Sequence, residues 1–144
     1  MTTSEMKFIY ASQYSSVCEQ EDFVLRIPAG IRSKVELLQS LANAGRFPEY
    51  FGRNWDALLD CLRDLSWISN KAVVIVHSDL PLRDNAAECR TYLEVLQTAL
   101  SDWARGTDSD ETKFRSEEAG VDHEMQVVFP SSVKVVIESL VARR

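Results

Sequence analysis

The sequence predicts an α/β protein: a small three-stranded parallel sheet flanked by helices, with short N- and C-terminal additions. Apolar segments of strand length at residues 22–28, 71–78 and 124–130 alternate with segments of helical periodicity. The second of them, KAVVIVHS, is rich in β-branched residues and typical of a parallel strand covered on both faces. The helical segments between the strands are long enough to form the crossovers that parallel strands require.

The first half of the chain is predicted to hold one clear strand and two helices. DFVLRIP at 22–28 has the composition of a strand, and KFIYAS at 7–12 could form a further short one. Ser33 and Glu36 then have the spacing of a capping box, ahead of apolar residues at helical spacing. Asn54 is suited to cap a second helix. The apolar positions of that helix are Trp55, Leu58, Leu59, Leu62 and Leu65.

The second half continues the same alternation. A helix is expected from about Asn85 to Trp103, long enough to cross over to the last strand. Residues 105–123 are expected to form an acidic loop. The stretch 102–124 has eight acidic against three basic residues, which leaves five net negative charges, and it has few apolar residues. Helical periodicity favours a helix over a strand at 133–141.

Length and composition predict a single domain, residues 1–144, in which residues 1–21 are an extension. The net charge of −6 and the pI of about 4.9 argue against direct binding to nucleic acid, which needs clustered Lys and Arg, and favour a basic partner. No apolar run approaches the roughly 20 residues of a membrane span, and the N-terminus lacks a signal-peptide pattern. A cytoplasmic protein without membrane contact is therefore expected.

Cysteines and histidines give no pattern of a catalytic or metal site. Cys18, Cys61 and Cys89 have neither C-x-x-C spacing nor clustered histidines, so they are expected to be reduced and buried. His77 ends a strand and His123 lies in a polar segment, and an isolated histidine at such a place is usually structural. No serine or cysteine lies in a nucleophile motif. The cysteines, histidines and serines therefore give no reason to expect an enzyme or a cofactor.

The segment FPEYFGRNWDALLDCL at 47–62 carries aspartates at helical spacing. Asp56, Asp60 and then Asp64 follow one another every four residues, so like charges are expected to repel along one helical face. The helix dipole favours Asp56 in the first turn, whereas Asp60 is mid-helix, where aspartate has poor propensity. Three explanations are open: a solvated surface, a Mg²⁺ site for phosphoryl chemistry, and a face that binds a cationic partner.

The same segment closely resembles the signature of the barstar-like ribonuclease inhibitors. The matching residues are Pro48, Glu49, Tyr50, Gly52, Asn54, Asp56, Ala57, Leu58, Asp60, Cys61 and Leu62. The order of strands and helices agrees with the three-stranded parallel sheet of that family. The resemblance implies a cytoplasmic protein inhibitor, an antitoxin or immunity protein, that blocks the active site of a basic ribonuclease (the toxin) and is not itself an enzyme.

The resemblance also implies which residues bind the partner. They are Tyr50, Gly52, Asn54, Asp56, Asp60 and Trp67. Asp60 would enter the pocket that normally holds the RNA phosphate, and Asp56 would contact a neighbouring Arg or Lys. Tyr50 would pack near the catalytic histidine, Gly52 would let the backbone approach closely, and Trp67 matches the family's aromatic only after a two-residue shift. A metal-dependent phosphohydrolase that uses the helix carboxylates is the alternative.

Overall fold

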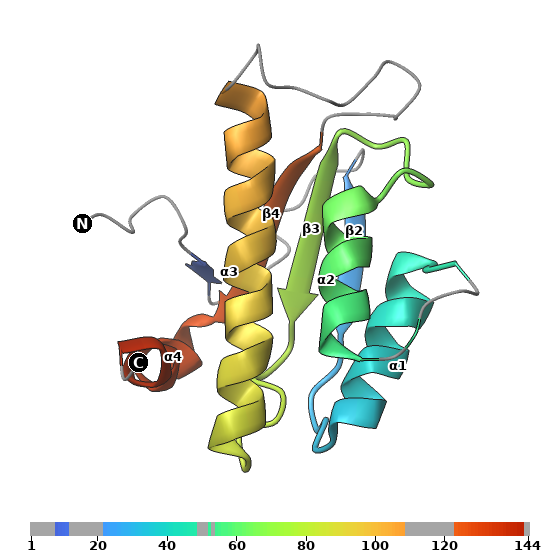
Figure 1. Cartoon of the computed structure of the whole chain (residues 1–144). Coiled ribbons are helices and arrows are strands. Elements are labelled where there is room, and N and C mark those ends of the chain that lie inside the picture. Colours follow the sequence, from blue (N-terminus) through green and yellow to red (C-terminus); the bar gives the residue numbers. More distant parts are fainter. Residues whose placement is uncertain (1–7, 12–21, 49–51, 53, 109–122, 143–144) are drawn as a thin grey trace.

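The computed structural model describes residues 8–11, 22–48, 52, 54–108 and 123–142 (Figure 1). Within these ranges the strands are β1 (Ile9–Ala11), β2 (Phe23–Ile27), β3 (Ala72–His77) and β4 (Glu124–Pro130). The helices are α1 (Lys34–Gly45), α2 (Trp55–Asp64), α3 (Ala86–Asp108) and α4 (Lys134–Ala142), and a short 3-10 helix, Ser131–Val133, precedes α4.

The strands form one sheet in the order β1-β4-β3-β2, and every neighbouring pair is parallel. Ile75 on β3 lies opposite Leu25 on β2 and Val127 on β4, and all three side chains are buried. The predicted parallel α/β fold is therefore confirmed. The sheet has four strands rather than three, because the short segment at 9–11 pairs with β4, with Ile9 opposite Val128.

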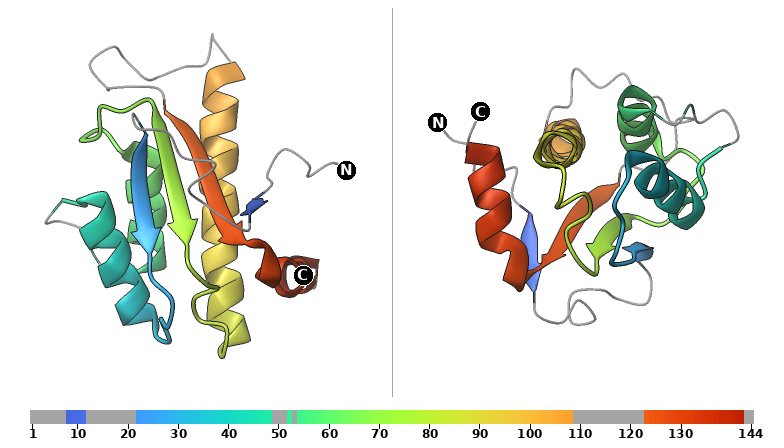
Figure 2. Two further views of the ribbon diagram at one scale, coloured as in Figure 1. Left: turned by 180° about the vertical axis from the view of Figure 1, so that it is seen from behind. Right: turned by 90° about the horizontal axis from the view of Figure 1, so that it is seen from below.

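Helices α1, α2 and α3 cover one face of the sheet, and α2 lies between the other two (Figures 1 and 2). The main core fills the space between these helices and the sheet. Its largest buried side chains include Leu25, Leu37, Leu41, Leu58, Leu62, Tyr92 and Phe129. A smaller buried cluster of Val74, Val76 and Val128 lies on the opposite face. Strand β3 is thus buried on both faces, as its continuous apolar sequence predicted.

Two boundaries differ from the prediction. Helix α3 runs to Asp108 instead of ending at Trp103, so the first residues of the predicted acidic loop are helical, and residues 109–122 lie outside the described part of the chain. The predicted N-terminal extension contributes β1 to the sheet. The C-terminal helix is confirmed as α4, which lies beyond the β1 edge of the sheet and contacts α3 through a hydrogen bond from Arg90 Nε to Leu140 O, 3.2 Å.

Helix α1 begins at its predicted cap, where Ser33 Oγ accepts a hydrogen bond from Glu36 N at 3.1 Å. Its last residue is Gly45, but the left-handed backbone conformation follows at Arg46, with φ of 56°. Space, not conformation, favours glycine here, because a Cβ on Gly45 would lie 2.7 Å from Phe47 Cε1. The chain therefore turns through a tightly packed corner before it reaches α2.

His77 is a buried structural residue, as expected. Its Nδ1 lies 2.9 Å from Val128 O, its Nε2 lies 2.7 Å from the Tyr92 hydroxyl, and its ring stacks on Phe129 at 4.0 Å. A neutral ring satisfies both contacts, since Nδ1–H donates to the carbonyl and Nε2 accepts from the hydroxyl. His77 thereby joins β3, β4 and α3.

Cys61 on α2 and Cys89 on α3 are buried free thiols, and Cys18 lies outside the described residues. The pKa of each of the two is raised to about 11, chiefly by burial, and for Cys61 the nearby carboxylates of Asp64 and Asp60 contribute to this rise. Since the thiolate is the reactive form, we expect both to react slowly with a thiol reagent in the native protein near pH 8.

The labelling is best measured in a Cys18→Ser variant, because Cys18 is expected to react fastest. Its two remaining thiols should label slowly in buffer and rapidly in denaturant. Rapid labelling of both thiols without denaturant would contradict the expected burial and thiol chemistry.

Candidate functional site

Helix α2 begins at the residue predicted to cap it. The Asn54 side-chain oxygen accepts a hydrogen bond from Ala57 N at 2.7 Å, and Asn54 Nδ2 lies 3.5 Å from Gly52 O. Asp56 follows in the first turn, where its exposed carboxylate interacts favourably with the helix dipole. The cap fixes the start of the helix on which the candidate residues lie.

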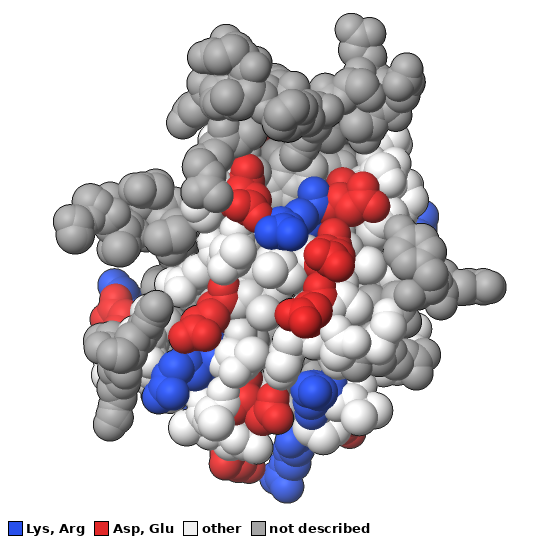
Figure 3. Space-filling view, in the orientation of Figure 1, with Lys and Arg blue, Asp and Glu red and all other residues white. Residues whose placement is uncertain are grey.

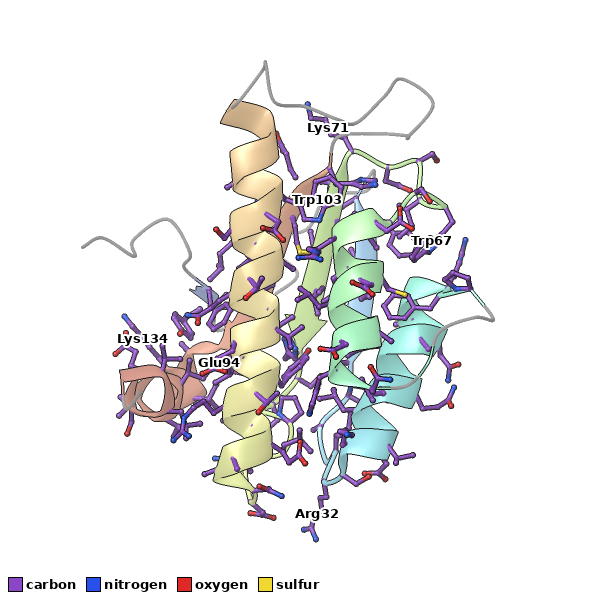
Figure 4. The ribbon with its side chains drawn as sticks, in the orientation of Figure 1. Arg32, Trp67, Lys71, Glu94, Trp103 and Lys134 are labelled. Atoms are coloured by element: carbon purple, nitrogen blue, oxygen red, sulfur yellow. The ribbon has the colours of Figure 1, made fainter. Side chains whose placement is uncertain are left out.

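The other end of α2 is held by side chains from α3 and from the residue before β4. Leu65 adopts a left-handed conformation with φ of 49°, and its N–H donates to Cys61 O at 3.1 Å. Trp103, which points from α3 toward α2 in Figure 4, donates from Nε1 to Leu62 O at 2.8 Å. His123 Nε2 lies 3.0 Å from Leu65 O. Carbonyl groups that lack partners within the helix are thus satisfied, and α2 is fixed at both ends.

One face of α2 is buried and the other is acidic. The buried side chains are Leu58, Cys61 and Leu62. Asp56, Asp60 and Asp64 are exposed, and 74% of the Asp60 side chain is accessible. Figure 3 shows acidic side chains gathered over α2 and the neighbouring part of α3. The predicted helical face of carboxylates is therefore present and open to a partner.

Arg63 lies within this acidic face. Its Nη2 is 3.6 Å from Asp60 Oδ1, and its Nη1 donates to Asp102 Oδ2 on α3 at 3.1 Å. In the first pair Arg63 compensates the charge of Asp60, as expected for opposite charges three residues apart on one helix. The second joins residues 39 positions apart, and the sequence offered no signal for it beyond the abundance of acids near Asp102.

Trp55 bridges three helices at the start of α2. Its indole Nε1 donates to Glu88 Oε1 on α3 at 3.0 Å, and its ring lies 6.1 Å from that of Tyr92. Lys34 Nζ on α1 lies 5.7 Å from the centre of the Trp55 ring. The Trp55 side chain is only half-buried, yet through these contacts it fixes α2 against α1 and α3.

Gly52 is exposed, and its contacts with the described residues do not require a glycine there. A Cβ would lie 3.5 Å from Asn54 Nδ2 and 3.6 Å from Ala57 Cβ, which are ordinary contact distances. The positive φ angle recorded for a described glycine belongs to Gly30, not to Gly52. Tyr50, the predicted aromatic contact, lies outside the described residues.

Trp67 lies beyond the C-terminal end of α2 and beside the end of α1 (Figure 4). Its Nε1 donates to Gly45 O at 2.9 Å, and its ring meets that of Phe47 edge to face with centres 5.9 Å apart. The side chain is half-buried, so part of it is accessible. The structure therefore brings Gly52, Asn54, Asp56 and Asp60 together along α2, whereas Trp67 lies apart and has an intramolecular role.

Two further observations concern the described residues. Among them, no three His, Cys, Asp or Glu side chains are gathered so that they could hold a metal ion, and Asp56, Asp60 and Asp64 are all within that set. No helix in this part of the chain is both long and apolar enough to cross a membrane. The three aspartates thus follow one helical face without converging on one point.

The comparisons with known proteins agree with the fold and with this helix. The family model described as Barstar (barnase inhibitor) matches residues 23–118, which is more than half of the chain and includes all of α2. The comparisons with curated proteins and with solved structures found no match. The parallel α/β architecture, the capped acidic helix and the family match together lead to one conclusion: this chain belongs to the Barstar (barnase inhibitor) family.

Proposed function

We propose that this chain is a cytoplasmic antitoxin or immunity protein that binds a basic ribonuclease and blocks its active site with α2 and the segment before it. One observation carries the proposal. Asp60 is a mid-helix carboxylate that is 74% exposed on a helix fixed at both ends, in a chain of an inhibitor family. Aspartate is a poor helix former, so its place there is better explained by binding than by folding.

Asp60 has the chemistry needed to replace a substrate phosphate. A ribonuclease holds the RNA backbone with Arg and Lys, and a carboxylate accepts the same charge-assisted hydrogen bonds that a phosphate accepts. Because α2 is held by Asn54 at one end and by Trp103 and His123 at the other, little conformational freedom is lost when Asp60 enters such a pocket.

The residues around Asp60 have supporting roles in this proposal. Asp56 pairs with a second cation beside the first, one helical turn nearer the N-terminus of α2. Gly52 permits close approach of the enzyme, since no contact with the described residues explains its missing side chain. Asn54 fixes the turn between them through its hydrogen bond to Ala57 N.

Tyr50 and Trp67 supply aromatic contacts to the ribonuclease in this proposal. Tyr50 precedes the cap of α2 and packs near the catalytic histidine of the enzyme. The exposed part of Trp67 forms the edge of the interface while its indole N–H stays bonded to Gly45 O. Aromatic side chains at such positions exclude water from the charged contacts.

The partner can be recovered with this chain as bait and an inactive bait as matched control. Lysate of the native host is passed over the immobilised chain and over its Asp56→Ala/Asp60→Ala double variant. We expect a basic protein on the wild-type column alone, with ribonuclease activity that appears after dissociation and disappears when the chain is added back in equimolar amount. Equal capture by both baits, or no effect of added chain on the recovered activity, would refute the proposal.

Association with that ribonuclease should slow as salt rises. The chain carries a net charge of −6, and its acidic face meets a basic enzyme, so long-range attraction speeds their encounter at low ionic strength. Screening shortens the range of this attraction to about 8 Å at physiological ionic strength. Stopped-flow association rates measured across a salt series should fall, whereas dissociation rates should change less. An association rate independent of salt would exclude electrostatic steering.

A further inference from the structure

A positive charge lies in the middle of the acidic face. Arg63 faces carboxylates on two helices, Asp60 Oδ1 at 3.6 Å and Asp102 Oδ2 at 3.1 Å, and Figure 3 shows a basic side chain between acidic ones on this face. Arg63 is 44% exposed and Asp102 25% exposed, so the guanidinium is anchored on one side and open to solvent on the other. A partner that pairs with Asp60 must therefore also meet Arg63.

The bridge to α3 restricts where this charge can go. Guanidinium is a planar group with five N–H donors, and pairing with carboxylates on two separate helices defines its orientation better than one pair within a helix would. Asp102 comes from α3, which is tied to α2 independently by the Trp103 Nε1 hydrogen bond to Leu62 O. Arg63 is thus held beside Asp60 rather than left free to swing away.

A wholly cationic pocket would be a poor partner for this pair. Its charges would be attracted to Asp60 but repelled by a guanidinium fixed one turn away on the same helix, and like charges brought together in an interface are costly. A pocket that places a carboxylate beside its cations would satisfy both groups. The chain's own arrangement of acid and base therefore selects for an opposite arrangement in the enzyme.

Ribonuclease chemistry supplies such an arrangement in one class of enzyme. RNA cleavage by acid–base catalysis needs a general base next to the groups that bind phosphate, and a carboxylate is one of the side chains that serve as such a base. We propose that Arg63 is a specificity-determining residue that pairs with a general-base carboxylate of the target ribonuclease, and that Asp102 is a positioning residue that holds Arg63 for this contact. This inference rests on the proposed inhibitory function and assigns to Arg63 and Asp102 a part in it.

The test is a double-mutant cycle between the chain and its cognate ribonuclease. Inhibition constants are measured for wild type and Arg63→Gln, each against the native enzyme and against an enzyme variant in which the general-base carboxylate is changed to its amide. We expect Arg63→Gln to weaken inhibition of the native enzyme by about tenfold or more, and to have little effect on the amide variant. Unchanged or tighter binding of Arg63→Gln to the native enzyme would overturn the inference, and so would an equal loss against both enzymes.

Asp102 is tested through its effect on Arg63. Asp102→Asn should weaken inhibition when Arg63 is present but change nothing further in the Arg63→Gln background, and Asp102→Glu should restore part of the loss. Thermal melting of each variant shows whether the fold is retained. Additive losses from the two substitutions would mean that Asp102 does not act through Arg63.

Failure of the inference and failure of the proposed function give different results. If the wild-type chain does not inhibit the ribonuclease, the proposed function itself is wrong. If the wild type inhibits and Asp60→Asn strongly weakens inhibition, but Arg63→Gln binds as well as wild type, then only the role of Arg63 is wrong.

Discussion

Asp60→Ala is expected to weaken inhibition of the cognate ribonuclease by about thirtyfold or more, a loss of at least about 2 kcal/mol on the scale of interface hot spots. The loss arises because enzyme cations that surround the carboxylate in the complex would be desolvated and left unpaired. The folded chain alone should be little affected. The side chain is 74% exposed, its pair with Arg63 is at 3.6 Å on the surface, and alanine is a better helix former.

Calorimetry and stopped-flow association of purified variants would measure this effect. Asp56→Ala should cost less affinity than Asp60→Ala, since part of the role of Asp56 is at the N-terminus of α2. Glu138→Ala on α4 is the matched control, because it removes one exposed acidic charge away from α2 and should leave affinity nearly unchanged. If Asp60→Ala binds as tightly as the wild type while its melting curve shows an intact fold, α2 is not the inhibitory element.

The second large effect concerns stability against pH. Burial lowers the pKa of His77 to about 4 in the folded protein, while the ordinary value is 6.5. Between these values the unfolded chain binds a proton that the native ring does not, so the free energy of unfolding falls as pH falls from about 6.5 to about 4 and is unaffected by His77 above that window. Over this window His77 alone is expected to lower the free energy of unfolding by about 2–3 kcal/mol.

Denaturant unfolding at a series of pH values would measure it, with His77→Gln as the control. Glutamine can still bond to the neighbouring carbonyl or hydroxyl but does not titrate. All other side chains are the same in both proteins, so the difference between the two pH profiles isolates His77. We expect the wild type to lose more stability than His77→Gln between pH 6.5 and pH 4, whatever their stabilities at pH 7. Parallel profiles would show that the native ring accepts a proton as readily as the unfolded one.

The elements that the sequence predicted well are those with strong local patterns. KAVVIVHS is continuously apolar and β-branched, and it became β3, which is buried on both faces. Ser33 and Asn54 satisfy backbone N–H groups three residues ahead, and a contact that local depends little on the rest of the fold. The spacing of Asp56 and Asp60 likewise fixed their shared exposed face once the segment was helical.

The features that could not be predicted depend on contacts between distant parts of the chain. The sequence offered residues 7–12 as a possible short strand but could not place it in the sheet, because β4 supplies its partner and three residues have no periodicity of their own. The Arg63 bridge to Asp102 and the indole hydrogen bond of Trp67 to Gly45 O join helices whose packing had to be known first. The sequence could not decide whether the aspartates form a metal site for the same reason. Spacing along one helix does not show whether side chains converge on one ion.

The pairing of β1 with β4 joins the first and the last of the described strands, and this has a consequence for the order of folding. Strands β2 and β3 and helices α1, α2 and α3 are consecutive in sequence, so their contacts close shorter loops than the pairing of β1 with β4 does and can form earlier. Strand β1 can be added only after β4, which follows the other described strands in the sequence, has joined β3. An intermediate that lacks β1 would leave one edge of β4 unpaired, which makes that intermediate the species most prone to self-association during refolding.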